Sequence, residues 1–229
     1  MNLPKFETPI HYITLPISEK EIQIRPFVIK EEKALLTSIN SDNKEEVIKT
    51  FDKIIEICVL NRDEVDIRNL NLIDFLYVLI YIRLKSLGED VEGSGKCSSC
   101  GKQSEFTFNL EDSLYVDNKD KEKVMVKIDD SLTLELKSAS ANVFFEEDPS
   151  ITDVIAASVS KVVFNKKVYK DFEREELKEN ILGNFTKKNF ESISEKMDEL
   201  PNMYVKFNYV CNHCQAMNEF YTEEVMDFF

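Results

Sequence analysis

The fold is decided by two short stretches, Lys96-Cys97-Ser98-Ser99-Cys100-Gly101 and Val210-Cys211-Asn212-His213-Cys214-Gln215. Each stretch holds two cysteines with two residues between them, a spacing that lets both sulfurs of one tight turn reach the same ion. Four thiolates in two such pairs match the tetrahedral site of a zinc ribbon. The sequence therefore predicts a structural Zn²⁺ whose ligands are Cys97, Cys100, Cys211 and Cys214.

The two cysteine pairs lie unusually far apart in the chain. A zinc ribbon ordinarily has about 15–20 residues between its pairs, whereas here the whole of residues 101–210 lies between Cys100 and Cys211. We therefore expect a split zinc ribbon that encloses an inserted α+β segment, residues 101–210. The strands that carry the ribbon are expected at residues 105–110, 203–210 and 217–221.

Other uses of these cysteines fit the sequence less well. Two disulfides need an oxidising compartment, and the sequence does not open with the pattern of a secretory signal. A redox pair normally lies as a single motif at the start of a helix. A catalytic zinc needs an open coordination position, which four sulfurs do not leave. We expect His213, which lies inside the second motif, not to be a ligand.

The composition restricts the class of partner. The chain has 229 residues, of which 29 are basic and 43 acidic, for a formal net charge of −14. Many zinc ribbons bind nucleic acid, but binding to phosphate backbones needs clustered positive charge. The net charge therefore argues against nucleic acid as a partner, and also against anionic membranes.

The most apolar run, residues 75–82, is too short to cross a bilayer. Cys58 lies in an apolar run and is expected to be buried.

The first ninety residues read as a hairpin followed by helices. Alternating apolar residues predict strands at 12–15 and 21–27 that pair across Ser18-Glu19-Lys20. Apolar positions three and four residues apart predict three helices, the second capped by Ser41 or Asp42 and the third ended by Gly88. The predicted helices span residues 29–39, 44–60 and 71–87. Residues 1–90 are therefore expected to form an N-terminal hairpin and a three-helix subdomain.

Residues 91–229 are expected to form the split zinc-ribbon domain, which makes the chain an α+β protein. Residues 89–96 are polar and rich in glycine, and we expect a flexible approach to the first motif. Their resemblance to a phosphate-binding loop fails, because Asp90 occupies the first glycine position and Cys97 follows the lysine. Further on we expect hairpins at 124–136 and 161–172 and helices at 150–160, 173–182 and 186–199.

No catalytic arrangement can be recognised in the sequence. The two histidines, His11 and His213, do not lie in a nucleophile motif, and most of the carboxylates are expected to be solvated. We therefore expect no catalytic residues, no enzyme activity and no small-molecule substrate.

The chain ends in two aromatic residues, Phe228 and Phe229. Leaving these rings in water would be costly, and either folding back or docking on a partner would bury them.

Three blocks of the chain resemble a known family. They are Ile22-Gln23-Ile24-Arg25-Pro26-Phe27, Lys30-Glu31-Glu32-Lys33-Ala34-Leu35-Leu36 and Arg83-Leu84-Lys85-Ser86-Leu87-Gly88-Glu89. Together with the two cysteine motifs they are similar to the baseplate hub assembly proteins of T-even-type contractile-tailed bacteriophages. The resemblance covers residues 10–110 well, and the remainder through Cys211, Cys214 and the general layout.

The resemblance implies a non-enzymatic structural or assembly protein of the baseplate hub that acts through contacts with other hub and tail proteins. Such a protein is made late, in the host cytoplasm, and the resemblance leaves open whether it stays in the virion. Within these blocks we expect Arg25 to pair with Glu31 or Glu32, and Arg83 to suit the C-terminal end of its helix. The alternative function is a zinc-ribbon nucleic-acid-binding or transcription accessory factor, which would bind with a steep dependence on salt.

Overall fold

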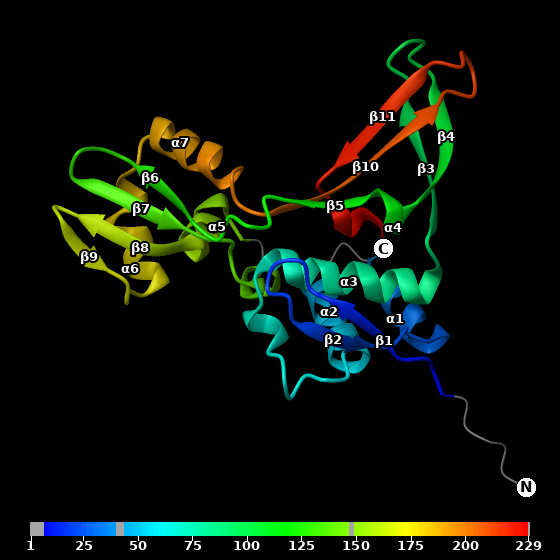
Figure 1. Ribbon diagram of the computed structural model, residues 1–229, viewed down its shortest axis with the longest axis horizontal. Coiled ribbons are helices and arrows are strands. Elements are labelled where there is room, and N and C mark those ends of the chain that lie inside the picture. The colour runs from blue at the N-terminus through cyan, green and yellow to red at the C-terminus, as the bar shows by residue number, and fades with distance from the viewer. Residues whose placement is uncertain (1–6, 40–43, 147–148, 229) are drawn as a thin grey trace, which may run out of the picture.

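The chain was studied as a computed structural model that describes residues 7–39, 44–146 and 149–228. The described residues form an α+β protein with seven α-helices and several small antiparallel sheets (Figure 1), which confirms the α+β part of the prediction. None of the helices within these ranges has the length and apolar character needed to cross a bilayer.

The N-terminal part begins with a two-stranded hairpin followed by three helices, as predicted. The hairpin consists of β1 (His11–Thr14) and β2 (Glu21–Ile24), which pair antiparallel across the expected turn. The helices are α1 (Ile29–Ile39), α2 (Lys44–Cys58) and α3 (Leu72–Leu87), with a short 3-10 helix η1 (Ile67–Asn69) before α3. Gly88 ends α3 as predicted, whereas the predicted capping by Ser41 or Asp42 lies outside the described residues.

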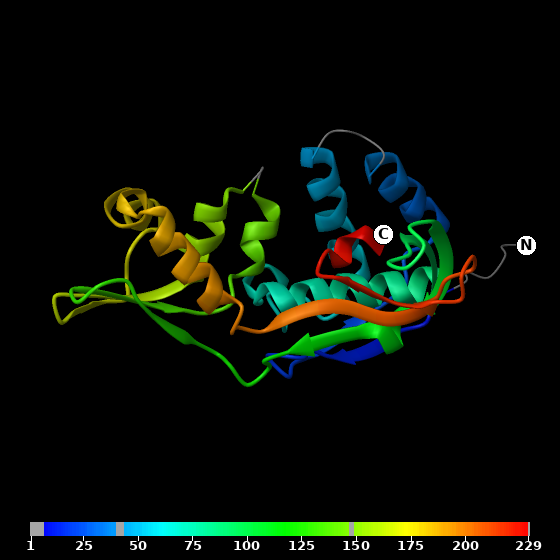
Figure 2. The same cartoon turned by 90° about the horizontal axis from the view of Figure 1, so that it is seen from above.

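The helix α3 is the centre of the molecule because it is apolar around most of its circumference, and such a helix must be covered on several sides. Phe75 and Leu79 pack into a core that includes β1, β2 and α2. Ile80 and Leu84 belong to a second core, which is formed with a three-stranded sheet on another side of the helix. Figure 1 shows α3 between the β1–β2 hairpin and this sheet, and Figure 2, seen from above, shows β10 running along α3.

The three-stranded sheet has the order β11-β10-β5 and joins segments that are far apart in the chain. Its strands are β5 (Leu114–Asp117), β10 (Asn202–Val210) and β11 (Met217–Thr222), all antiparallel. The short helix α4 (Leu110–Ser113) leads into β5, and a 3-10 turn η4 (Val225–Phe228) follows β11. Met203 and Val205 on β10 are buried in the core against α3.

The stretch before the first cysteine motif is a strand, so the expected flexible link is wrong. β3 (Asp90–Lys96) pairs along its whole length with β4 (Gln103–Asn109). A Cβ atom on Gly93 would lie 2.7 Å from the Phe106 ring, and one on Gly95 would lie 2.9 Å from the Tyr209 hydroxyl. The two glycines therefore leave room for aromatic rings against the strand, and they do not mark a loop.

Residues between β5 and β10 form a distal lobe, at the left of Figure 1, with its own core. Its sheet has the order β6-β7-β8-β9, from β6 (Val124–Lys127), β7 (Leu132–Leu136), β8 (Val159–Phe164) and β9 (Lys167–Tyr169). Its helices are α5 (Ile151–Ser158), α6 (Arg174–Asn180) and α7 (Lys187–Met197), with η3 (Leu182–Asn184) between the last two. Both hairpins and all three helices were predicted, although the helices are shorter than expected. Capping boxes begin α5 at Ser150 and α7 at Thr186.

One segment of the distal half packs back on the N-terminal core. The 3-10 helix η2 (Ala141–Phe145) places Phe144 and Phe145 against Phe75, with ring centroids 5.0 and 5.3 Å apart. The segment η2 therefore belongs to the N-terminal core, although it lies between β7 and α5 in the chain. The division into residues 1–90 and 91–229 stays a prediction.

Several single-residue predictions are confirmed. Arg25 pairs with Glu31, with 3.0 Å between Nη2 and Oε1. Arg83 donates from Nε to the Phe228 carbonyl (2.9 Å) and from Nη1 to the Gly88 carbonyl (2.6 Å), so it joins the end of α3 to the C-terminal turn. Phe228 folds back against Phe108 (ring centroids 5.7 Å apart), whereas Phe229 is outside the described residues. Cys58 is fully buried, and burial raises the pKa of its thiol to about 12.

Candidate metal centre

Two hairpin tips bring the four predicted cysteines together, at the upper right of Figure 1. The Sγ atoms of Cys97, Cys100, Cys211 and Cys214 all lie within 4.8 Å of one another. The Cys97–Cys214 and Cys100–Cys211 sulfur distances are 3.6 and 3.8 Å. A tetrahedral ion with metal–sulfur bonds of about 2.3 Å has sulfur–sulfur edges of about 3.8 Å, whereas a disulfide bond is about 2.05 Å long. The cluster therefore fits a metal ion and not two disulfides.

Both tips have the same turn geometry. The amide that follows each cysteine pair donates to the carbonyl of the first cysteine, from Gly101 to Cys97 (2.9 Å) and from Gln215 to Cys211 (3.0 Å). The residues at these two positions have φ of 72° and 61°, the left-handed region that favours glycine. The glycine of the first motif made this turn predictable, whereas Gln215 adopts the same backbone with a side chain.

Each tip is also bonded to a side chain of the other hairpin. The Ser98 amide donates to Asn218 Oδ1 (2.9 Å), and the Asn212 amide donates to Ser104 Oγ (3.0 Å). Ser104 and Asn218 are buried, at 1% and 6% exposure, and each lies seven residues after the first cysteine of its own motif. The two hairpins thus exchange equivalent hydrogen bonds. Neither residue was predicted to support the site, although their equal spacing from the two cysteine motifs is a signal that could have identified them.

The environment of the sulfurs favours thiolates but not four at once. Amide donors at Cys100 and Ser99 lower the pKa of Cys97 to about 6, helped by the Asn218 side chain. The His213 amide likewise lowers the pKa of Cys211. The Ala216 amide also favours the Cys214 thiolate, but burial and the three neighbouring sulfurs outweigh it and raise this pKa to about 12. Four thiolates at this spacing therefore need a cation between them.

His213 has a different contact from the cysteines around it. Its Nε2 atom lies 3.0 Å from the Gln103 carbonyl, to which it can donate from the exposed side of the tip. This hydrogen bond ties the second motif to the first hairpin. A metal ion bound by all four sulfurs would have a complete tetrahedral set of ligands, without an open position at which a bound water could react.

A layer of aromatic rings lies beneath the sulfurs and fastens the two hairpins at their base. Phe108 of β4 stacks on Phe207 of β10 with centroids 4.0 Å apart, and Phe106 lies 5.4 Å from Phe220 of β11. Aromatic pairs of this kind contribute about 0.5–1.5 kcal/mol beyond the area that they bury. The hairpins are therefore held together at two levels, by the rings and by the sulfurs.

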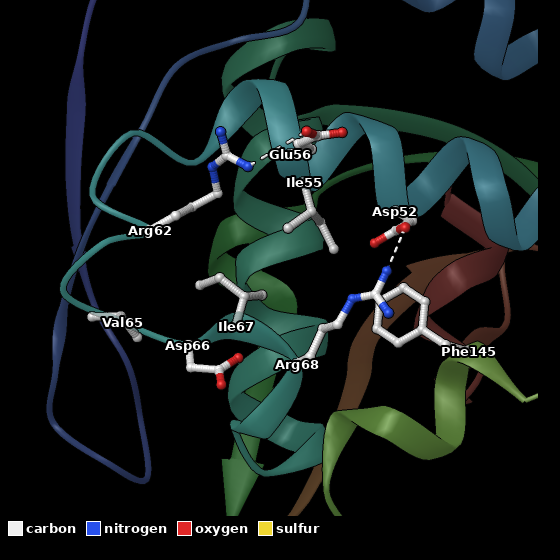
Figure 3. A pocket seen from close by; sticks show the side chains of 9 residues that line it. All are labelled: Asp52, Ile55, Glu56, Arg62, Val65, Asp66, Ile67, Arg68 and Phe145. Atoms are coloured by element: carbon white, nitrogen blue, oxygen red, sulfur yellow. Dashed lines mark hydrogen bonds and ion pairs between the residues drawn. The ribbon is translucent and has the colours of Figure 1, made fainter.

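Apart from the cysteine cluster, the protein has a cavity between α2 and η1 (Figure 3). It is a cavity of about 570 Å³ whose apolar side chains include Ile55 and Ile67. Arg68 reaches Asp52 on α2 (2.5 Å) and lies over the Phe145 ring, 4.7 Å from its centroid. A second arginine, Arg62, faces Glu56 at 3.9 Å. Both guanidinium groups lie beside carboxylates of α2. These contacts therefore join η1, and the loop between α2 and η1 that carries Arg62, to that helix.

Comparison with known proteins agrees with this architecture. The family described as T4 bacteriophage base plate protein matches residues 8–229, almost the whole chain. The chain therefore belongs to this family, and the resemblance drawn from its sequence blocks is confirmed at the level of a T4-type phage baseplate protein. No curated protein and no solved structure gives a significant match.

Proposed function

We propose that the protein is a non-enzymatic component of the central hub of the baseplate and that it acts through contacts with other hub and tail proteins during tail assembly. The observation that carries this proposal is the family match over residues 8–229, together with the sequence blocks typical of hub assembly proteins. Assembly in the host cytoplasm would keep the cysteines reduced and available to a metal.

We further propose that the metal is a structural Zn²⁺ bound by Cys97, Cys100, Cys211 and Cys214. Four sulfur ligands at tetrahedral spacing are the usual environment of a structural zinc, and the sulfur distances of 3.6 and 3.8 Å support this assignment. The ion would close the chain across residues 101–210. It would thereby hold both ends of the segment that contains the distal lobe, in the split-ribbon domain proposed for residues 91–229.

The hub proposal can be tested by purifying the tagged protein from infected cells and identifying its companions. We expect defined hub and tail proteins to co-purify, with about one zinc per chain measured in the same sample. Cys211→Ser is expected to lose the zinc and fail to complement a deletion, whereas Cys58→Ala, which changes a cysteine outside the cluster, should complement.

Two results would contradict the hub proposal: intact tails after deletion, and no binding to neighbouring tail proteins. The nucleic-acid alternative predicts salt-sensitive binding, so a mobility-shift titration at low salt is the direct comparison. We expect it to stay flat, because the net charge of −14 opposes binding to phosphates.

A further inference from the structure

Three tyrosines form a row on the outer face of the three-stranded sheet. They are Tyr115 on β5, Tyr204 on β10 and Tyr221 on β11, and Tyr204 points away from α3 because its neighbours Met203 and Val205 point toward it. Ring centroids are 5.6 Å apart for Tyr115 and Tyr204 and 5.1 Å apart for Tyr204 and Tyr221. Tyr115 and Tyr221 are 45% and 51% exposed. Exposed tyrosines of this kind are enriched in protein interfaces.

A cavity of about 330 Å³ opens beside two of these rings, where the sheet meets the end of α7. Tyr204 and Tyr221 line it, and its charged lining residues are all acidic: Asp117, Asp198 and Glu223. The Tyr204 hydroxyl donates to Asp117 Oδ2 (2.9 Å), and the Tyr221 hydroxyl donates to Glu223 Oε1 (2.5 Å). These hydrogen bonds turn the carboxylates toward the rings.

The nearby lysines of the chain pair with other carboxylates. Lys206 pairs with Glu219 at 2.9 Å, and Lys121 and Lys196 both pair with Glu199. Within the described part of the chain, the four cysteines form the one group of three or more side chains close enough to share a metal ion. The carboxylates of the cavity are more widely spaced, which suits an extended organic cation better than a metal.

We infer that this cavity binds an arginine side chain of a protein partner. A planar guanidinium can stack on a tyrosine face while its five N–H donors reach separate carboxylates. An ammonium group offers three donors from one point and cannot span them in this way. The volume lies at the lower end of the range for ligand sites, about 300–1,000 Å³, so a single side chain fits better than a cofactor.

The position of the cavity indicates what the contact would do. Asp198 follows α7 of the distal lobe, whereas Asp117 and Tyr221 belong to the sheet packed on α3. One arginine bound here would therefore bridge the distal lobe and the sheet. If the proposed hub function holds, the partner is another tail protein; the chemistry of the cavity is argued without that function.

The test is a titration of the full-length, zinc-loaded protein with a Gly-Arg-Gly peptide whose two ends are chemically blocked. Binding is monitored through the NMR signals of the tyrosine rings. We expect the Tyr204 and Tyr221 signals to shift and saturate. The matched citrulline peptide, which has the same shape without the charge, and the matched lysine peptide should bind at least about fivefold more weakly. Tyr221→Thr and Asp117→Asn should each weaken binding by a similar factor, whereas Tyr12→Thr, which removes a 61% exposed tyrosine from β1, should not.

The inference is overturned if the arginine peptide causes no shift, if citrulline or lysine binds equally well, or if both cavity variants bind like the wild type. Zinc content and circular dichroism of each variant establish that it is folded. Peptide binding without co-purification of tail proteins would contradict the hub proposal alone. Co-purification without peptide binding would contradict the cavity assignment alone.

Discussion

The core around α3 and the hairpin tips that carry the cysteines are stabilised in different ways. Around α3, helices and a hairpin bury large apolar side chains such as Phe75, Leu79 and Ile24 completely. At the tips, none of the seven residues of β3 is buried, and a two-stranded hairpin is marginally stable in water by itself. The difference teaches that strands which extend beyond the apolar core need another source of stability, which a metal ion bound by the four cysteines would supply.

The largest effect is expected from removing one sulfur ligand with Cys211→Ser. Structural zinc contributes on the order of 10 kcal/mol to small zinc domains, so hydrogen exchange should lose the protection of β3, β4 and the tips of β10 and β11. The amides of α3 should stay protected, because neither of the two cores to which the helix belongs contains a cysteine of the cluster. Cys58→Ala is the control and should keep its zinc. Equal loss of protection in both regions would show that the two are one cooperative unit.

A substitution in the core around α3 tests the other side of this comparison. Phe75→Ala should cost about 3–5 kcal/mol of the free energy of unfolding, because the buried ring leaves a cavity beside Phe144 and Phe145. The loss, measured by urea denaturation, should be similar with and without a zinc chelator. Phe164→Ala, at a ring that is 44% exposed, should cost on the order of 1 kcal/mol. If the loss of unfolding free energy caused by Phe75→Ala disappeared when the zinc was chelated, the core around α3 and the cysteine tips would not be stabilised independently.

A smaller effect is expected at the residues that orient the cysteine turns. Asn218→Ala removes the acceptor of the Ser98 amide and a donor to the Cys97 sulfur. Losses of such supporting bonds weaken metal binding by about 10- to 100-fold, which competition with a chromophoric chelator would measure. Asn208→Ala, at an exposed position of β10, should leave the affinity unchanged. Equal affinities for the two variants would mean that the hydrogen-bond exchange between the hairpins does not support the site.

The smallest effect is expected on the pH dependence of stability in the distal lobe, whose separate core contains no cysteine. A hydrogen bond from Lys161, with help from Ser160 and Lys123, lowers the pKa of Glu135 from 4.5 to about 2. Because the folded pKa lies below the unfolded one, the stabilisation is present above pH 4.5 and is lost as the pH falls toward 2. It is expected to be at most about 1 kcal/mol, since Lys123 is exposed and Lys161 is only partly buried, and ion pairs near the surface contribute little.

The matched variant for this pH effect is Glu135→Gln, which cannot ionise. The difference in the free energy of unfolding between the wild type and this variant should shrink between pH 5 and pH 2. A difference that does not change over this range would mean that the carboxylate is not stabilised in the folded protein. Zinc binding is expected to be the same in both proteins, because the residue lies on β7 of the distal lobe and not at the hairpin tips.

Local sequence predicted most of the elements and the four cysteines of the cluster. Helix periodicity, the helix end at Gly88 and the turn residues between strands act over a few positions, so they can be read directly. The prediction failed at β3, because glycine in a polar stretch resembles a loop until the Phe106 ring that covers it is known. It also missed Ser104 and Asn218, whose partners lie more than a hundred residues away.

By itself, the sequence determined that two pairs of cysteines must form tight turns and that α3 must be buried on several sides. Spacing and apolar periodicity are properties of neighbouring residues, and they hold in any fold. Only the tertiary structure decided that the two tips exchange hydrogen bonds, and that Tyr204 and Tyr221 meet Asp198 after α7 and Asp117 of β5. These contacts depend on how distant segments are placed in space, which no local pattern records.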